Sequence, residues 1–182
     1  MTRKTYAPRR RNVGFGLIEL MITLGIGLAL VAIAVAVSSG VRADSNASKM
    51  QTQVLQISSQ ATTMANGGAF DGMTLATLIR AEKIPNSWIV DNDGTQTVRN
   101  PFGGDITLDA DGGRLDVIST NVPAGVCTTV VNNTMGSFSQ ILVGTEQIET
   151  DATPAEIANA CADSGAPVQM TFRTGVQPAA MD

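Results

Sequence analysis

Residues 9–37 read RRRNVGFGLIELMITLGIGLALVAIAVAV, and this stretch decides how the rest of the chain must be arranged. From Phe15 to Val37 the side chains are apolar or nearly so, except for the acid Glu19. As an α-helix, these 23 residues (37 − 15 + 1) would extend over roughly 34 Å, enough to cross the hydrocarbon core of a bilayer. An ionised carboxylate costs about 2.5 to 3.5 kcal/mol in that setting, so the presence of Glu19 requires an explanation.

The charges before the apolar run set its orientation. Five cationic residues and no acidic residue precede it: Arg3, Lys4, Arg9, Arg10 and Arg11. A basic flank stays on the cytoplasmic side, so we expect the chain after Val41 to lie across the membrane. Two ordinary interpretations are a signal anchor and a secretory signal peptide that is cut at Ala34-Val35-Ala36. The apolar run is much longer than the usual signal-peptide core of about 7 to 15 residues, and neither interpretation explains Glu19.

The segment Gly14-Phe15-Gly16-Leu17-Ile18-Glu19-Leu20-Met21-Ile22 resembles the N-terminal signature of type IV prepilins and type II secretion pseudopilins. In that family a basic leader ends in Gly, a dedicated peptidase cuts after the Gly, and the new N-terminal residue is N-methylated. The fifth residue of the mature chain is Glu. The resemblance therefore implies a cleaved leader at residues 1–14, cleavage between Gly14 and Phe15, methylation of Phe15, and Glu19 at the fifth mature position.

The same resemblance implies a role for Glu19 in assembly. Cleavage creates an α-amino group on Phe15, and this cation is buried in the core of a filament unless it is paired. The carboxylate of Glu19 on a neighbouring subunit can pair with it. Because breaking one partner of a buried pair typically costs about 3 to 5 kcal/mol, Glu19 is interpreted as the residue that sets the register between subunits.

Composition agrees with an exported structural protein. The chain has no His, which excludes imidazole acid–base catalysis and His-ligated metals. Without the leader, 168 residues (182 − 14) carry 7 basic (12 − 5) and 16 acidic side chains, a net charge of −9. This charge argues against nucleic-acid binding by the mature subunit. We expect no cofactor, no metal and no catalytic residue.

The two cysteines, Cys127 and Cys161, both follow the membrane run. A pair of cysteines in an exported domain indicates one disulfide. It would close a span of 34 residues (161 − 127), worth about 3.5 to 4 kcal/mol in the chain-entropy model. The alternative is a pair of reduced cysteines in the core.

The helical pattern continues beyond the apolar run, since no proline occurs between Pro8 and Pro85. Apolar residues recur at spacings of 4, 3, 4 and 3, which is one face of a helix: Met50, Val54, Ile57, Ala61 and Met64. Gly67-Gly68 is a suitable C-terminal cap. We therefore expect one helix over residues 15–66, with a transmembrane and polymerisation half at 15–41 and an amphipathic half at 42–66. Gly25 and Gly27 are the candidates for local flexibility in its first half.

Residues 67–182 are expected to form an α+β head domain. Three helices are predicted. One includes Leu75, Leu78 and Ile79, one starts at Pro123, and one follows the capping box at Thr153-Pro154-Ala155-Glu156. Predicted strands are Ser87–Val90, a hairpin on either side of 109–113, Phe138–Val143 and a final strand over 168–173. This pattern predicts an antiparallel sheet packed on the long helix, the fold of type IV pilins.

Two acidic clusters resemble fragments of a calcium loop, namely Asp91-Asn92-Asp93-Gly94 and Asp109-Ala110-Asp111-Gly112. Neither has the ligand spacing or the closing Glu of an EF-hand. Asp, Asn and Gly are also the usual turn residues, so both clusters are interpreted as turns. Major pseudopilins carry a calcium site near the C-terminus, whereas residues 161–182 contain only Asp163 and Asp182, which favours a pilin.

Within the family the chain resembles type IVb pilins, such as the toxin-coregulated and conjugative thin-pilus subunits. The resemblance rests on the 14-residue leader, on Asn100-Pro101-Phe102-Gly103-Gly104, and on Cys127 and Cys161 before a last strand. It implies a major pilin that forms a thin extracellular fibre for attachment, aggregation or mating contact. The implied location is the bacterial inner membrane, as a single-pass prepilin, and then the extracellular pilus.

The partners implied are other copies of the chain, the prepilin peptidase and methyltransferase, the inner-membrane assembly platform, the secretin, and membrane lipid before assembly. Two alternatives stay open. One is a minor pilin or a type II secretion pseudopilin of the same fold. The other is a single-pass anchored binding domain or enzyme, although nothing in the head resembles a catalytic constellation.

Overall fold

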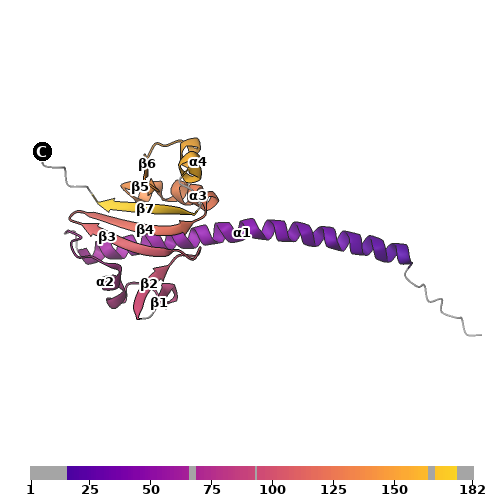
Figure 1. The fold of residues 1–182 in the computed structure, drawn as a ribbon, viewed down its shortest axis with the longest axis horizontal. Coiled ribbons are helices and arrows are strands. Elements are labelled where there is room, and N and C mark those ends of the chain that lie inside the picture. Colours follow the sequence, from indigo (N-terminus) through magenta and orange to yellow (C-terminus); the bar gives the residue numbers. More distant parts are fainter. Residues whose placement is uncertain (1–15, 66–68, 93, 164–166, 176–182) are drawn as a thin grey trace, which may run out of the picture. The chain divides into compact units, whose positions relative to one another are not determined.

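The computed structural model describes residues 16–65, 69–92, 94–163 and 167–175; for residues 28–41 and 163 it describes the backbone alone. By its contacts the chain divides into two units, residues 1–41 and residues 42–182. Helix α1 (Leu17–Ala65) runs through both units (Figure 1). Its described bounds agree with the predicted helix over 15–66 to within two residues. Phe15 and the predicted cap Gly67-Gly68 lie outside the described residues.

The amphipathic half of α1 buries the predicted face. Met50, Val54, Ile57 and Ala61 are fully buried, and Met64 is half-buried at the end of the stripe. The spacing of 4 and 3 residues keeps these side chains on one side of the helix, where they pack against the apolar side of the sheet. The prediction that this half lies on a globular domain is therefore confirmed.

Polar side chains fix how this half of α1 lies on the sheet. The Ser58 and Thr174 hydroxyls are hydrogen-bonded to each other with 2.8 Å between the oxygens. The Gln53 side-chain amide donates to the backbone carbonyl of Arg99 over 3.2 Å. Each contact joins residues far apart in the sequence, so the helix and the sheet form a single core.

The sheet of the head has seven antiparallel strands in the order β1-β2-β3-β4-β7-β5-β6 (Figure 1). The strands are β1 (Ile89–Asn92), β2 (Thr95–Arg99), β3 (Asp105–Asp111), β4 (Arg114–Val122), β5 (Gln140–Val143), β6 (Glu146–Ile148) and β7 (Val168–Gly175). The last strand in the sequence, β7, lies between β4 and β5 and joins two blocks of strands. The predicted α+β fold class is confirmed.

Short helical segments lie between the strands in the sequence: α2 (Leu75–Arg80), α3 (Ala124–Thr134), α4 (Pro154–Asp163) and the 3-10 turns η1 (Asn86–Trp88) and η2 (Met135–Ser137). The predicted capping box of α4 is present. The Glu156 backbone N–H donates to Thr153 Oγ1 over 3.3 Å, and the Thr153 backbone N–H donates to Glu156 Oε2 over 2.7 Å. Pro154 is the first residue of α4, as predicted.

The structure corrects several of the predicted strands. The strand expected over Phe138–Val143 begins at Gln140, because its pairing with β7 starts there, opposite Arg173. The strand expected from Ser87 begins at Ile89, because residues 86–88 form the turn η1. Strands β2 and β6 were not predicted. Asp109 and Asp111, expected in a turn, belong to β3 because Ala110 continues the alternation that faces the core, and Gly112, with φ of 56°, forms the turn.

Candidate assembly surface

The first turn of α1 is built around the backbone carbonyl of Gly16. This carbonyl accepts hydrogen bonds from the N–H groups of Glu19 (3.0 Å) and Leu20 (3.2 Å). Glu19 therefore lies in the first turn, where the helix dipole favours a negative charge. Its side chain is exposed, and among the described residues it has no ion-pair partner.

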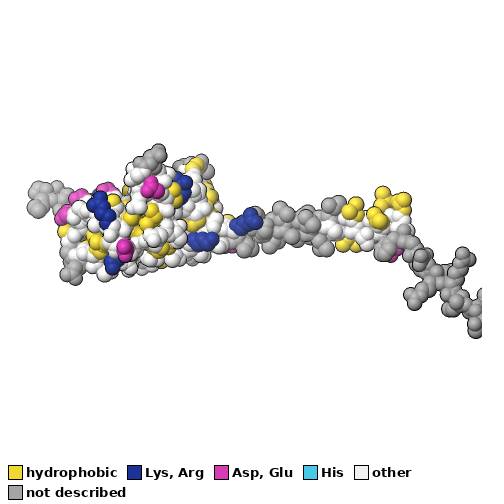
Figure 2. Space-filling model, turned by 90° about the horizontal axis from the view of Figure 1, so that it is seen from below, with side chains coloured by type: hydrophobic (Ala, Val, Ile, Leu, Met, Phe, Trp, Pro, Cys, Tyr) yellow, Lys and Arg dark blue, Asp and Glu magenta, His cyan; other side chains and the backbone are white. Residues whose placement is uncertain are grey.

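Large exposed apolar side chains gather on the N-terminal part of α1 (Figure 2). Seven of them are between 57% and 78% exposed: Leu17, Ile18, Leu20, Met21, Ile22, Leu24 and Ile26. At 100° per residue these positions cover about two thirds of the circumference of the helix, and Glu19 and Thr23 lie on the remaining side. An exposed apolar surface this wide requires burial, either in lipid or among other helices.

Other residues predicted to act in this segment are only partly described. Gly14 and Phe15, the predicted cleavage and methylation site, lie outside the described residues. Gly25 and Gly27 are in α1, and a Cβ added at either would meet nothing within 4 Å. Packing within the chain therefore does not require glycine at these two positions, and their predicted role in helix flexibility stays a prediction.

Among the residues whose side chains are described, no helix is both long enough and apolar enough to cross a membrane. The span predicted over residues 15–37 extends into residues 28–41, whose side chains lie outside that set.

In the head, the predicted disulfide is present and ties α3 to α4. Cys127 and Cys161 are bonded, with 5.8 Å between their Cα atoms and 34 residues between them in sequence. Both cysteines are buried. Three valines of α3, Val126, Val130 and Val131, are also buried, so the disulfide lies within the core between α3 and α4.

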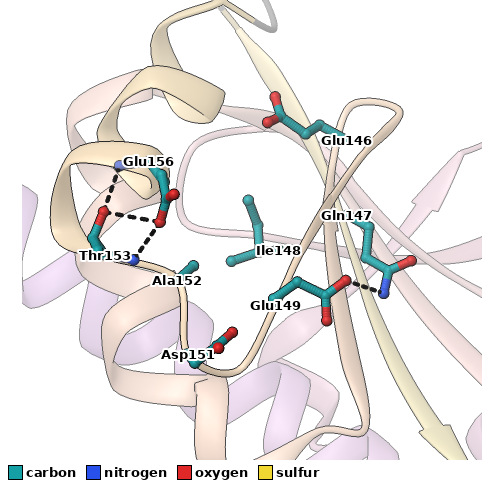
Figure 3. A pocket seen from close by; sticks show the side chains of 8 residues that line it. All are labelled: Glu146, Gln147, Ile148, Glu149, Asp151, Ala152, Thr153 and Glu156. Atoms are coloured by element: carbon teal, nitrogen blue, oxygen red, sulfur yellow. Dashed lines mark hydrogen bonds between the residues drawn. The ribbon is translucent and has the colours of Figure 1, made fainter.

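An acidic hollow lies beside the disulfide-linked corner, between β6 and the start of α4 (Figure 3). Four of its lining side chains are carboxylates, namely Glu146, Glu149, Asp151 and Glu156. Hydrogen bonds from the backbone N–H and the hydroxyl of Thr153 lower the pKa of Glu156. Since β6 is an edge strand, the charges oppose pairing of this edge with another strand. This acidic hollow was not predicted. A signal for it is present in the sequence, since residues 115–172 contain six acids and no Lys or Arg.

An ion pair on the sheet was also not predicted. The Arg173 guanidinium donates from Nε to Asp116 Oδ1 and from Nη2 to Asp116 Oδ2, both over 2.8 Å, and from Nη1 to Gln140 Oε1. The hydrogen bonds to Asp116 raise the pKa of Arg173. Arg114 Nε lies 3.6 Å from Asp116 Oδ2. These residues connect β4, β7 and β5 across the sheet.

The acidic fragment 91–94 is only partly a turn: Asp91 and Asn92, expected in the turn, end strand β1, and Gly94, with φ of 84°, lies in the turn. Asp91 Oδ1 accepts a hydrogen bond from the backbone N–H of Gly94 over 2.9 Å. At the other fragment, Arg114 Nη2 lies 4.0 Å from Asp109 Oδ2. In the part of the chain that the structure describes, no group of three or more His, Cys, Asp or Glu side chains is arranged to hold a metal ion.

Comparisons with known proteins agree on one family and one fold. Residues 43–173 match the family described as PilS N terminal. No curated protein sequence matches the chain. Among solved structures, the type IVb pilin from Salmonella typhi is similar with a TM-score of 0.57 and 17% identity, over 70% of this chain and 98% of that one.

A second solved structure is TcpA, a type IV pilin from Vibrio cholerae El Tor biotype. It is similar with a TM-score of 0.50 and 14% identity, over 72% of this chain and 99% of that one. At these identities the two likenesses establish the fold of the chain.

Proposed function

The chain belongs to the PilS N-terminal family and has the fold of a type IVb pilin, and we propose that it is the major subunit of a thin extracellular pilus. The observation that carries the proposal is the first part of α1. Exposed apolar side chains cover most of its circumference, and its one charged side chain, Glu19, is exposed in the first turn. A helix of this kind supports assembly by parallel packing of identical helices.

The proposed route begins in the inner membrane. The prepilin spans it once, with the basic leader in the cytoplasm and with lipid around the apolar helix. The prepilin peptidase and methyltransferase remove residues 1–14 and methylate Phe15. The assembly platform then moves the subunit into the growing fibre, which leaves through the secretin. The fibre would serve attachment, aggregation or mating contact.

Glu19 would set the register between subunits in this fibre. The Phe15 ammonium of one subunit is buried in the helix bundle and pairs with the Glu19 carboxylate of a neighbour. Loss of one partner from a buried pair costs about 3 to 5 kcal/mol, which corresponds to roughly a 150-fold to 5,000-fold weaker contact. An uncut or misplaced subunit would incur that cost.

The test compares fibre yield among variants of one carboxylate. Glu19→Ala should leave membrane insertion and cleavage intact but lower the ratio of sheared fibre to membrane-bound subunit by at least a hundredfold. Glu19→Asp keeps the charge with a shorter reach and should assemble poorly. Asp44→Ala is the matched control, because Asp44 is an exposed carboxylate on the same helix beyond the apolar segment. Wild-type yield from Glu19→Ala would refute the pairing.

The same preparations separate a major subunit from a minor pilin or a pseudopilin. A major subunit should be the most abundant protein in sheared fibres, with an intact mass that lacks residues 1–14 and carries one added methyl group. If the chain is a trace component of fibres built from another protein, the proposal of a major subunit is wrong.

A further inference from the structure

Thr23 is a hydroxyl residue within the apolar part of α1, and its hydroxyl proton is hydrogen-bonded to the backbone of the same helix. Thr23 Oγ1 donates to the backbone carbonyls of Glu19 (2.9 Å) and Leu20 (3.0 Å). A hydroxyl has one proton and two lone pairs. With the proton held by the helix itself, the exposed Thr23 side chain can only accept hydrogen bonds from a partner.

Thr23 and Glu19 are neighbours on one face of the helix. Residues four apart in an α-helix have Cβ atoms about 5 to 6 Å apart. Gly27 is the next residue along the same face, and a Cβ at that position would meet nothing within 4 Å. The face therefore carries two adjacent hydrogen-bond acceptors, one charged and one neutral, beside an uncrowded stretch of helix.

We propose that Thr23 Oγ1 and the Glu19 carboxylate together form a two-acceptor site for the α-ammonium group of a second copy of the chain. The inference rests on the proposed function, because that ammonium exists only after cleavage between Gly14 and Phe15. A methylated α-ammonium has two N–H groups. One donates to the carboxylate of Glu19 and the other donates to the Thr23 hydroxyl oxygen.

The geometry of an ammonium suits this pair of acceptors. With donor–acceptor distances of about 2.8 Å and a tetrahedral angle between the two N–H bonds, the acceptor oxygens lie about 4.6 Å apart. The spacing of residues four apart on a helix allows that separation, since the flexible Glu19 side chain can adjust its oxygen to it. A helix-borne carboxylate alone would leave one N–H unsatisfied inside an apolar bundle, which is costly.

The first experiment uses full-length chain in cells that assemble the fibre. Thr23→Val keeps the shape but removes the acceptor, and it should lower the ratio of sheared fibre to processed, membrane-bound subunit by about tenfold to a hundredfold. Thr23→Ser keeps the acceptor and should stay within about threefold of wild type. Thr52→Val is the matched control, because Thr52 Oγ1 makes the same bond to the carbonyl four residues before it (2.9 Å) with no acid at that position.

A second measurement separates ammonium binding from an effect of Thr23 on the helix alone. Variant and wild-type subunits are co-expressed, and the variant fraction in sheared fibres is counted by intact mass. Glu19→Ala and the double variant Glu19→Ala/Thr23→Val should be incorporated equally, because the neutral hydroxyl alone does not hold the ammonium once the carboxylate is lost.

Two results would overturn the inference. One is wild-type fibre yield from Thr23→Val. The other is a further tenfold loss when Thr23→Val is added to Glu19→Ala, which would show that Thr23 acts independently of the carboxylate. The proposed function is tested separately, since cleavage of residues 1–14 and the effect of Glu19→Ala are measured in the same samples.

Discussion

Removal of the Cys127–Cys161 disulfide should destabilise the head by a predictable amount. The bond closes 34 residues of chain. The chain-entropy relation for a loop of that length gives about 12.6 cal/mol/K, or about 3.8 kcal/mol at 25 °C. Both cysteines are buried, so alanine at the two positions adds no polar group to the core. The double variant Cys127→Ala/Cys161→Ala should therefore lose about 4 kcal/mol of unfolding free energy.

The assay is urea unfolding of a head fragment that begins at Arg42. All buried apolar residues of the described chain lie between Ala47 and Phe172, so the fragment keeps the whole core. Trp88 is the only tryptophan in the chain and packs partly buried against that core, so its fluorescence reports unfolding. With a urea m-value of about 2 kcal/mol/M, the midpoint should fall by about 2 M.

Two comparisons decide the result. Reduced wild-type head should unfold at the midpoint of the double variant, because both lack the same constraint. Reductant should not change the midpoint of the double variant. A fall of less than about 0.5 M, equivalent to about 1 kcal/mol, would show that the disulfide does not restrict the unfolded chain as reasoned.

Three further predictions use the same fragment. Arg173→Met leaves Asp116 buried without its main partner and should cost about 3 to 5 kcal/mol in urea unfolding, whereas Arg173→Met/Asp116→Leu should recover most of the loss. Gly104→Ala would place a Cβ 2.0 Å from a backbone carbonyl oxygen of β4 and should cost about 3 kcal/mol, whereas Gly125→Ala, with open space around it, should not destabilise the head. The pKa of Glu156 is lowered in the fold, so its carboxylate stabilises α4 above the ordinary glutamate pKa of about 4.3 and ceases to do so as pH falls through the lowered pKa. The difference in the free energy of urea unfolding between wild type and Glu156→Gln should accordingly be present at neutral pH and vanish at low pH.

Local patterns in the sequence predicted the elements that depend on local physics. The spacing of Met50, Val54, Ile57 and Ala61 gave the buried face of α1, and the capping box at Thr153 gave the start of α4. In each case the information lies within one or two helical turns. The disulfide was also predicted, because an exported domain with two cysteines leaves few alternatives.

Features that depend on distant partners were not predicted. The residues of β2 (Thr95–Arg99) are mostly polar, and their strand conformation comes from pairing with β1 and β3. The pair Asp116 and Arg173 is separated by 57 positions in sequence, and only the register of β4 with β7 brings the two together. Nor does the sequence indicate that the last strand is inserted between β4 and β5.

The position of β7 makes an intact chain a condition of folding. A polypeptide is synthesised from its N-terminus, and the strands β1–β4 and β5–β6 are available before Val168 is added. Until β7 arrives, the facing edges of β4 and β5 have no partner in the sheet. A subunit whose synthesis stops early therefore exposes open strand edges, which are templates for aggregation. Only subunits that contain the whole of β7 would therefore have a closed sheet when they assemble.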